Sequence, residues 1–573
     1  MPTRTPAPPR RWWRGRRPPR PGWPRCSRDP CDPSVDAAWP TVCVGGHDLR
    51  VGPLLVRRLA LLVTVLTFAG AGLAACSSGA KPESSPLALT ALRAEADPVR
   101  GGRIVDGEGR EVLLRGVNVN ALAEYWKGVD FPTTFPLASD DTARMRSIGW
   151  DAVRLLVSWS RIEPGPGHYD EAYLDQVART VRRLGQAGLY SIIDFHQDAW
   201  GPATAARPGE RCVPPAVPGL GWDGAPAWAT LDGDLPRCTL GAREINPATM
   251  RAWQAFFTDE KASDGVGVQT RYVAMLGHVA GRFARSPEVA GYDLMNEPNA
   301  FVPADNQRLA TMYRLAVASI RRAERAAHGS PHLILFEPSA LFSAIGSGPP
   351  PSFSRDADLV YAPHIYTGGF TGGPITRAAF ETAQREARAL GGVPVLSGEW
   401  GADPARASRP DDSYFVEHQQ LQDDFRAGAT LWTWRESCGD PHKVSDLRAG
   451  RVPGVWGEFE VDCHDNSVTG TRDALVAQLR RGYVRAAPGR LSRTRWDPDR
   501  ASLEASGRAG KNGGGDGARL VAFHPAARPA DVRVTVRGLD APDLLAVRGG
   551  GVLISARAHG GAWSIRVARL NGR

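Results

Sequence analysis

Between residues 98 and 490, short apolar runs alternate with amphipathic segments, and this alternation restricts the possible folds more than any other feature of the chain. Apolar runs of strand length separated by helical segments indicate parallel strands joined by crossover helices. The eight runs that we interpret as strands are 112–119, 152–158, 190–195, 289–295, 333–336, 359–365, 393–397 and 430–434. Eight such units predict a (β/α)₈ barrel, whose active site lies at the carboxyl ends of its strands.

The segments between these runs carry apolar residues at positions i, i+3 and i+4, which is the spacing of one buried helix face. We expect helices at 140–148, 171–187, 250–283 in pieces, 308–327, 377–390 and 413–427. Residues 200–250 form a Gly-, Pro- and Trp-rich insertion after the third strand, and 301–307 and 341–358 are shorter insertions on the same face. A structureless stretch as long as 200–250 is usually functional or disordered.

The sequence pattern changes after about residue 497, where short alternating apolar runs are separated by Gly-rich turns. The five runs are 519–523, 532–536, 544–547, 552–556 and 563–567. Short alternating strands of this kind predict a small β-sandwich. We therefore divide the body into a barrel domain over 98–490 and a C-terminal β-sandwich domain over 491–573.

The N-terminal region has the pattern of an export signal. Arg57 and Arg58 precede an uncharged apolar run that ends in Leu-Ala-Ala-Cys76. A basic first region, a short apolar core and small residues before the cleavage site are typical of a signal peptide. We assign this signal peptide to residues 51–75. The ending resembles a bacterial lipoprotein box, which implies lipidation of Cys76 and a flexible tether over 76–97. A transmembrane anchor is the alternative, although seventeen residues are short for one.

Residues 1–50 lack helix or strand periodicity and are rich in Pro, Arg and Trp. We expect them to be a mis-assigned or disordered extension, with Val51 or Val56 as the true start. Residues 1–58 hold twelve Arg and four Asp, and they account for most of the formal net charge of +9. The remainder is nearly neutral, so no nucleic-acid partner is expected.

Four cysteines remain in the body, namely Cys212, Cys238, Cys438 and Cys463. An even number in an exported protein suggests disulfides. Three pairings are possible, and short loops favour Cys212–Cys238 and Cys438–Cys463. A metal site is the alternative, but no CxxC or His-rich spacing accompanies these cysteines. We expect no metal and no cofactor.

Polar and aromatic side chains stand at one end of nearly every predicted strand. The strongest signals are Asp293-Leu-Met-Asn296-Glu297-Pro298 after the fourth strand and Leu396-Ser-Gly-Glu399-Trp400 after the seventh. Two carboxylates at the same end of a barrel are what glycoside cleavage requires. The other strands contribute Arg154, His196 with Asp198, His364 with Tyr366, and Trp434. Glu337 and Glu436 also follow strands, but we assign them no role.

This ordered set resembles glycoside hydrolase family 5, and several details resemble its endoglycosylceramidase branch. Those details include Arg115-Gly-Val-Asn118, Tyr125-Trp-Lys127-Gly, Asp194-Phe-His196-Gln-Asp198 and Arg481-Gly-Tyr483-Val-Arg485. The resemblance covers residues 100–490 and implies a retaining enzyme with a barrel and a C-terminal sandwich.

The resemblance also implies a role for each residue. Glu399 would be the nucleophile, with a depressed pKa, and Glu297 the general acid and then base. Arg154 would hold Glu399 ionised by charge pairing. Tyr366 would donate to the same carboxylate and fix its rotamer, and Asn296 would bond the sugar 2-OH. The remaining residues would contact the sugar: His196, His364, Trp434, Lys127 and Asp198. The alternatives are a structural ion pair for Arg154, core positions for the histidines and Trp434, and solvated positions for Lys127 and Asp198.

The leading interpretation is hydrolysis of the β-glycosidic bond between glycan and ceramide by an exported, monomeric lipoprotein on the extracytoplasmic face of the membrane, or by a secreted form. An endo-β-glucanase, mannanase or other β-glycosidase acting on polysaccharide or oligosaccharide is the alternative. A more remote alternative is a non-catalytic sugar-binding lipoprotein. A polysaccharide enzyme should have an open groove, and a glycolipid enzyme an apolar surface beside the nucleophile.

Overall fold

A computed structural model describes residues 88–342, 350–510 and 517–570 of the chain. The predicted N-terminal extension, the signal peptide and the lipid site Cys76 lie outside these residues. Residues 83–573 form one compact unit. Within the described residues, none of the helices combines the length and the apolar character needed to cross a bilayer.

Eight parallel strands form the central sheet, in the order β11-β10-β9-β6-β5-β4-β13-β12. A parallel bridge between Tyr361 and Val395 closes its two ends into a barrel. The strands are β4 (Arg115–Val119), β5 (Ala152–Ser158), β6 (Tyr190–His196), β9 (Val289–Asp293), β10 (Leu333–Phe336), β11 (Leu359–Tyr361), β12 (Leu396–Trp400) and β13 (Gly428–Leu431). They are buried along their whole length, as expected when helices cover a parallel sheet. The predicted (β/α)₈ barrel is confirmed.

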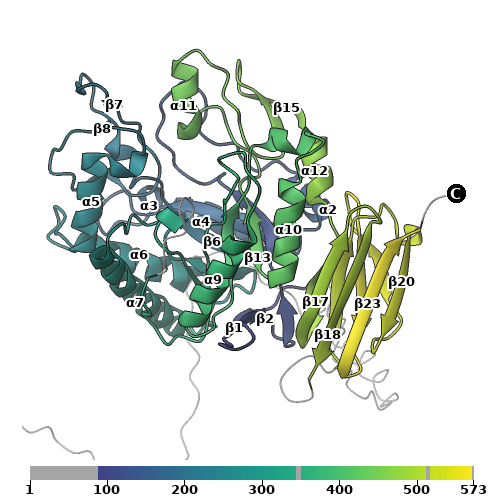
Figure 1. Ribbon diagram of the computed structural model, residues 1–573. Helices are drawn as coiled ribbons and strands as arrows, with labels where there is room; N and C mark the ends of the chain where they lie inside the picture. Colours follow the sequence, from purple (N-terminus) through teal and green to yellow (C-terminus); the bar gives the residue numbers. More distant parts are fainter. Residues whose placement is uncertain (1–87, 343–349, 511–516, 571–573) are drawn as a thin grey trace, which may run out of the picture. The chain divides into compact units, whose positions relative to one another are not determined.

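Helices cover the outside of this barrel (Figure 1). They are α2 (Asp141–Ile148), α3 (Trp159–Ile162), α4 (Glu171–Gln186), α5 (Pro247–Phe257), α6 (Val268–Phe283), α7 (Pro303–Ala326), α9 (Arg377–Ala389) and α10 (Tyr414–Phe425). In α4, Asp170 caps the first turn, and the buried face includes Leu174, Val177 and Val181. Because α7 begins at Pro303, most of the predicted insertion 301–307 is helical instead.

Eleven further strands form two larger sheets that enclose a second core. The first has the order β1-β2-β3-β16-β19-β22-β21 and the second β17-β18-β23-β20, and the strands of the second lie side by side in Figure 1. Their bounds are β1 (Arg93–Glu95), β2 (Arg103–Val105), β3 (Arg110–Val112), β16 (Tyr483–Pro488), β17 (Arg490–Asp497), β18 (Ser502–Ala509), β19 (Arg519–His524), β20 (Val532–Arg537), β21 (Asp543–Ala546), β22 (Val552–Arg557) and β23 (Gly561–Arg569). Leu503, Ile554 and Trp563 are buried between them.

The seven-stranded sheet corrects three expectations. Strand β16 pairs antiparallel with β3 and with β19, so the sheet combines both ends of the body and is not confined to residues after 491. The expected tether 76–97 ends in β1, which pairs with β2. The predicted strand 112–119 is two strands, β3 and β4, that belong to different sheets. In each case the sheet to which a segment belongs depends on pairing with other strands, which local sequence does not show.

This sheet lies against the amino end of the barrel. One apolar cluster includes Ile192 and Leu335 from barrel strands together with Phe523 and Leu553 from the sheet. The Tyr483 hydroxyl donates to the Gly149 carbonyl at 2.9 Å. The opposite, carboxyl end of the barrel is therefore free for the site.

Six short elements complete the loops at that end. They are β7 (Val217–Pro218) with β8 (Cys238–Thr239), α11 (Pro441–Arg448), β14 (Phe459–Asp462) with β15 (Ser467–Thr471), and α12 (Asp473–Leu479). Cys212 is bonded to Cys238, and Cys438 to Cys463, which is the pairing that short loops favour. Each disulfide closes a loop that contributes a wall of the site.

Candidate active site

The carboxyl ends of the barrel strands bring two glutamates together. Glu399 lies on β12, and Glu297 follows β9. Carboxylate oxygens of the two residues and a nitrogen of His364 all lie within 4.8 Å of one another. The His364 Nδ1 atom is 2.9 Å from Glu297 Oε1 and 3.5 Å from Glu399 Oε2. The imidazole therefore contacts both carboxylates.

The backbone of Glu297 is held in an unusual conformation. Its φ angle is 36°, in the left-handed region that residues with a β-carbon rarely adopt. The Glu297 N–H donates to Glu337 Oε2 at 2.9 Å, and its carbonyl accepts from Gln197 Nε2 at 3.0 Å. Such strain persists where surrounding contacts over-determine the conformation, and it is common at functional sites.

Arg154 is fully buried and connects the site residues. Its guanidinium donates to Glu399 Oε1 at 2.8 Å and to Glu337 Oε1 at 2.9 Å. The remaining acceptors are Asp194, Asp293, Asn118 and Asn296. The Tyr366 hydroxyl donates to the second Glu399 oxygen at 2.8 Å. Both oxygens of Glu399 are thus fixed by donors.

The direction of the Glu399 pKa shift differs from the expectation. Burial raises the pKa of Glu399 above its usual value and outweighs the lowering by His364, Arg154 and His196. The expected depression of this pKa is therefore not found. Burial also acts to lower the pKa of His364, but Glu337 and Glu399 outweigh it and raise that pKa well above its usual value. The acidic groups around His364 thus favour its protonated form.

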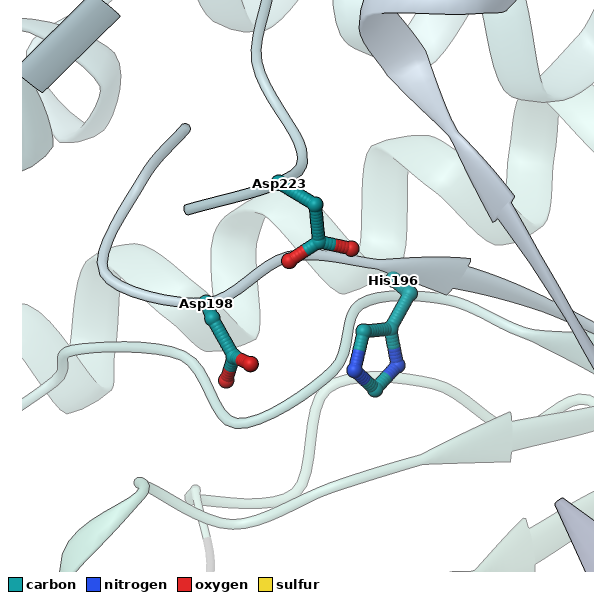
Figure 2. Close-up of side chains that lie close together, drawn as sticks. All are labelled: His196, Asp198 and Asp223. Atoms are coloured by element: carbon teal, nitrogen blue, oxygen red, sulfur yellow. The ribbon is translucent and has the colours of Figure 1, made fainter. Parts of the chain in front are cut away.

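Three buried side chains form a second group beside the glutamates, and Figure 2 shows them turned toward one another. His196 ends β6, Asp198 follows it, and Asp223 comes from the insertion between Cys212 and Cys238. Their ligand atoms also lie within 4.8 Å of one another. Burial acts to lower the pKa of His196, but Asp194 and Asp223 raise it to about 10.

Asp223 is the residue of this group that the sequence did not single out. It is fully buried, and neither of its carboxylate oxygens has a hydrogen-bond partner among the described residues. Burial raises its pKa to about 8. A buried polar group without a partner is rare and indicates a missing ligand or a functional role. No motif could have found Asp223, because its segment has no helix or strand periodicity.

The predicted sugar platform Trp434 belongs to the core instead. Its ring contacts Trp150 and Phe459, and only 2% of the residue is exposed. Trp432 faces the site, where its ring stacks on His196 at 5.5 Å. Strand β13 ends at Leu431, so the alternation of side chains along a strand no longer predicts where residues 432–434 point.

Lys127 and Asp198 are not brought together. Lys127 is exposed and has no ion pair with another described residue. Asp198 accepts a hydrogen bond from Arg243 Nη2 at 2.7 Å. The Arg243 guanidinium lies 4.1 Å above the Trp222 ring. An arginine of the insertion therefore contacts Asp198, and its distance in sequence concealed this.

The remaining predicted residues lie in the site. Asn296 is buried, with its amide between Arg154 and the Gln197 carbonyl. Glu337, left unassigned by the sequence, contacts Arg154 and the Glu297 backbone and lies 3.1 Å from His364 Nε2. Its place directly after β10 is the signal that could have identified it.

Three groups of acidic and histidine side chains in the described parts of the chain have ligand atoms close enough for a metal ion. They are His196–Asp198–Asp223, Glu297–His364–Glu399 and Glu436–Asp440–His442. The pKa of each histidine is raised by the acidic groups around it, despite burial. The same nitrogens and carboxylate oxygens also suit hydrogen bonding to a hydroxylated ligand.

The sequence model of the family described as Cellulase (glycosyl hydrolase family 5) matches residues 105–437. Endoglycoceramidase I of Rhodococcus hoagii is 29% identical over 293 residues, which are 48% of this chain and 53% of that protein. Glucosylceramidase of Aspergillus fumigatus is 26% identical over 259 residues, 35% of this chain and 32% of that protein. The match thus spans about half of the first relative and a third of the second.

Solved structures resemble a larger part of the chain. A crystal structure of endogalactoceramidase has a TM-score of 0.73 and 35% identity, and the match covers 84% of this chain and 100% of that one. Endo-glycoceramidase II from Rhodococcus sp., in a ganglioside GM3 complex, has a TM-score of 0.63 and 26% identity over 81% of this chain and 99% of that one.

Proposed function

The chain belongs to glycosyl hydrolase family 5, and we propose that it cleaves the β-glycosidic bond between glycan and ceramide in glycosphingolipids, with retention of configuration. The observation that carries the reaction type is that one carboxylate oxygen of Glu297 lies within 4.8 Å of one carboxylate oxygen of Glu399. Retaining glycosidases hold their two carboxyl groups roughly 5–5.5 Å apart, whereas inverting enzymes need about 6.5–9.5 Å to accommodate a water.

In the first step, a Glu399 oxygen attacks the anomeric carbon while Glu297 gives its proton to the departing glycosidic oxygen. The product is a glycosyl ester on Glu399 and a free ceramide hydroxyl. Arg154 and Tyr366 orient the attacking carboxylate through the hydrogen bonds to its two oxygens. In the second step, Glu297 takes a proton from water, and the water oxygen attacks the same carbon and releases Glu399.

The contacts among Glu297, His364 and Glu399 support this exchange of roles. Groups in such contact titrate as a coupled set. A negative Glu399 favours a protonated Glu297, as the acid step requires. The ester removes that charge, and the His364 cation 2.9 Å from Glu297 then favours the ionised form, as the base step requires.

The sugar next to the scissile bond would lie between the glutamates and the His196–Asp198–Asp223 group. An imidazolium donor and carboxyl acceptors suit the hydroxyls of a pyranose, and Trp432 offers it a flat apolar face. This arrangement leaves the opposite side of Glu399 to the aglycone.

An exposed aromatic surface begins beside the nucleophile and supports a lipid aglycone. The Tyr366 ring lies 4.5 Å from the Phe370 ring, which lies 5.8 Å from that of Trp456. Phe370 is 64% exposed. An exposed apolar surface marks an interaction site. The similarity of the chain to ceramide-cleaving proteins is the second support.

Turnover of glycosylceramides tests this proposal. Glu297→Gln and Glu399→Gln should each abolish hydrolysis while circular dichroism remains unchanged, and normal turnover in either variant would contradict the assignment. Proton NMR of the first-formed sugar should show the β-anomer. Faster hydrolysis of β-glucan or mannan than of any glycosylceramide in a substrate panel would favour a polysaccharide enzyme.

The aglycone surface has its own test. Phe370→Ala should raise KM for glycosylceramide and leave hydrolysis of a methyl β-glycoside of the same sugar unchanged. Leu545→Ala, at an exposed position on β21, serves as the control. Equal effects on both substrates would contradict a role in binding the lipid.

We also propose that the protein is exported and anchored through a lipid on Cys76. The signal pattern supports this, and so do the two disulfides, which persist in oxidising compartments. Radiolabelled palmitate should enter the wild-type protein in cells but not a Cys76→Ala variant. Labelling of that variant would refute the anchor.

A further inference from the structure

A cavity of about 730 Å³ is lined by thirteen residues, none of which belongs to the active site, and five of the thirteen are arginines. They are Arg100, Arg103, Arg426, Arg490 and Arg508. Arg426 lies two positions before the first residue of β13, and therefore stands at the amino end of the barrel, opposite the active site. Arg490 begins β17, and Arg508 lies on β18 of the sandwich. The cavity thus lies between the barrel base and the sandwich.

The acidic groups of the cavity do not balance these charges. Glu95 is paired with Arg103 at 2.6 Å, and Asp97 with Arg100 at 2.7 Å. Asp97 is also 3.5 Å from Arg490. Among the described residues, the side chain of Arg426 donates a hydrogen bond only to the Ser492 carbonyl, at 3.5 Å.

Two of the arginines have no acidic partner at all among residues 88–342, 350–510 and 517–570. These are Arg426 and Arg508, and neither forms an ion pair there. The register of the sheet places Arg508 directly opposite Arg490. Like charges at directly opposed positions of an antiparallel pair are destabilising. Burial and the neighbouring Arg100 and Arg103 lower the pKa of Arg490, whereas Glu111 and Asp97 raise it.

The nearest buried acid does not remove this imbalance. Glu111 is almost fully buried beneath the cavity and accepts a hydrogen bond from the Leu491 N–H at 2.9 Å. Burial raises its pKa and outweighs the lowering by Arg426, Arg103 and Arg490. Even with Glu111 ionised, the five arginines of the cavity face three acids, Glu95, Asp97 and Glu111, so the guanidinium groups retain an excess of positive charge that an anion would neutralise.

We propose that this cavity binds a phosphate-bearing ligand through Arg426, Arg490 and Arg508. A guanidinium presents parallel N–H donors that match two oxygens of a phosphate. The volume is within the range of ligand sites and exceeds that of a single phosphate ion, so it fits a phosphate together with part of the molecule that carries it.

Such a ligand could be a free phosphate ester or a phospholipid head group. The cavity includes Glu95, nineteen positions after the predicted lipid site Cys76. A head group bound here would hold the amino end of the barrel against the anchoring membrane and direct the active site away from it. The proposal does not depend on the catalytic function, because none of these residues contacts the active site.

Calorimetric titration of the folded protein with glycerol 3-phosphate tests the proposal. Saturable binding is expected, and it should be weakened about tenfold or more in the Arg426→Gln/Arg508→Gln variant, since two charge-assisted contacts are lost. Arg533→Gln, an exposed arginine on β20 outside the cavity, should bind as the wild type does. Hydrolysis of a soluble glycoside should be equal in all three proteins, which shows that the fold is intact.

A vesicle assay distinguishes the two sources. Co-sedimentation with phosphatidylglycerol but not phosphatidylcholine vesicles, lost in the double variant, would identify a head group. Binding of glycerol 3-phosphate without sedimentation would identify a soluble ester. The proposal is overturned if the wild type binds neither probe, or if the double variant binds as tightly as the Arg533→Gln control.

Discussion

Replacement of Glu337 by Gln tests whether this buried carboxylate positions the catalytic groups. One Glu337 oxygen accepts from Arg154 Nη2 at 2.9 Å and lies 3.1 Å from His364 Nε2, and the other accepts from the Glu297 N–H at 2.9 Å. Glutamine has the same shape but only one acceptor oxygen. Its amide NH₂ must therefore face a donor on one side or the other.

The magnitude follows from the bond that is lost. A hydrogen bond involving a charged group contributes about 1.5–3 kcal/mol, which corresponds to a loss of about 10- to 150-fold in kcat if it displaces Glu297. KM should change little, because the Glu337 side chain is only 2% exposed and cannot contact substrate. A structural role alone would lower the melting temperature without this division between kcat and KM.

The pH profile provides a second readout. Burial lowers the pKa of His364, and Glu337 is the first of the charges that raise it. Without Glu337 that pKa falls, so His364 loses its proton at a lower pH, and the basic limb of the kcat profile should move to lower pH. Steady-state kinetics across pH, with Glu381→Gln on α9 as control, measures both effects. Unchanged kcat and an unchanged basic limb in a folded Glu337→Gln protein would refute the reasoning.

Three further predictions concern neighbouring residues. Tyr366→Phe removes one donor to Glu399, so single-turnover glycosylation should slow by roughly tenfold; an unchanged rate would rule out that role. Asp223→Asn should raise KM. The Asp223 pKa rises from 3.8 in the unfolded chain to about 8 in the folded protein, so the free energy of unfolding of the wild type should fall as pH rises from about 4 to about 8. The variant should lose less over the same pH range. Urea-unfolding free energies that change with pH in parallel for the two proteins would contradict this. Trp434→Ala should lower the free energy of unfolding by about 3–5 kcal/mol, whereas Trp432→Ala should mainly lower kcat/KM. The reverse pattern would identify Trp434, and not Trp432, as the ring that contacts the sugar.

The apolar periodicity of the sequence predicted the barrel, because the burial of each strand in a parallel sheet is visible in the residues of that strand alone. The apolar runs at 152–158 and 333–336 coincide with β5 and β10, since a strand buried on both faces reads as a continuous apolar run. The same reading located Glu297 and Glu399, because strand ends converge at one edge of a barrel. It could not show that β3 and β4 separate, because their partners are hundreds of residues apart.

The residues that the sequence missed or misplaced share one property, which is that their neighbours come from elsewhere in the chain. Trp432 and Trp434 both follow a strand, and only the fold around β13 separates a sugar platform from a core residue. The Arg243 contact with Asp198 connects a long insertion to a strand end. Local propensity carries no information about such contacts.

The type of fold could thus be predicted from the linear sequence, and the proposals of a catalytic pair and an export signal also rest on it, because each depends on spacing within a short segment. The charge of Glu399, the partnerless carboxylate of Asp223 and the arginine cavity depend on which groups are buried together. Burial and electrostatic coupling act through space over a few ångströms, and it is the tertiary fold that brings these distant side chains within that range.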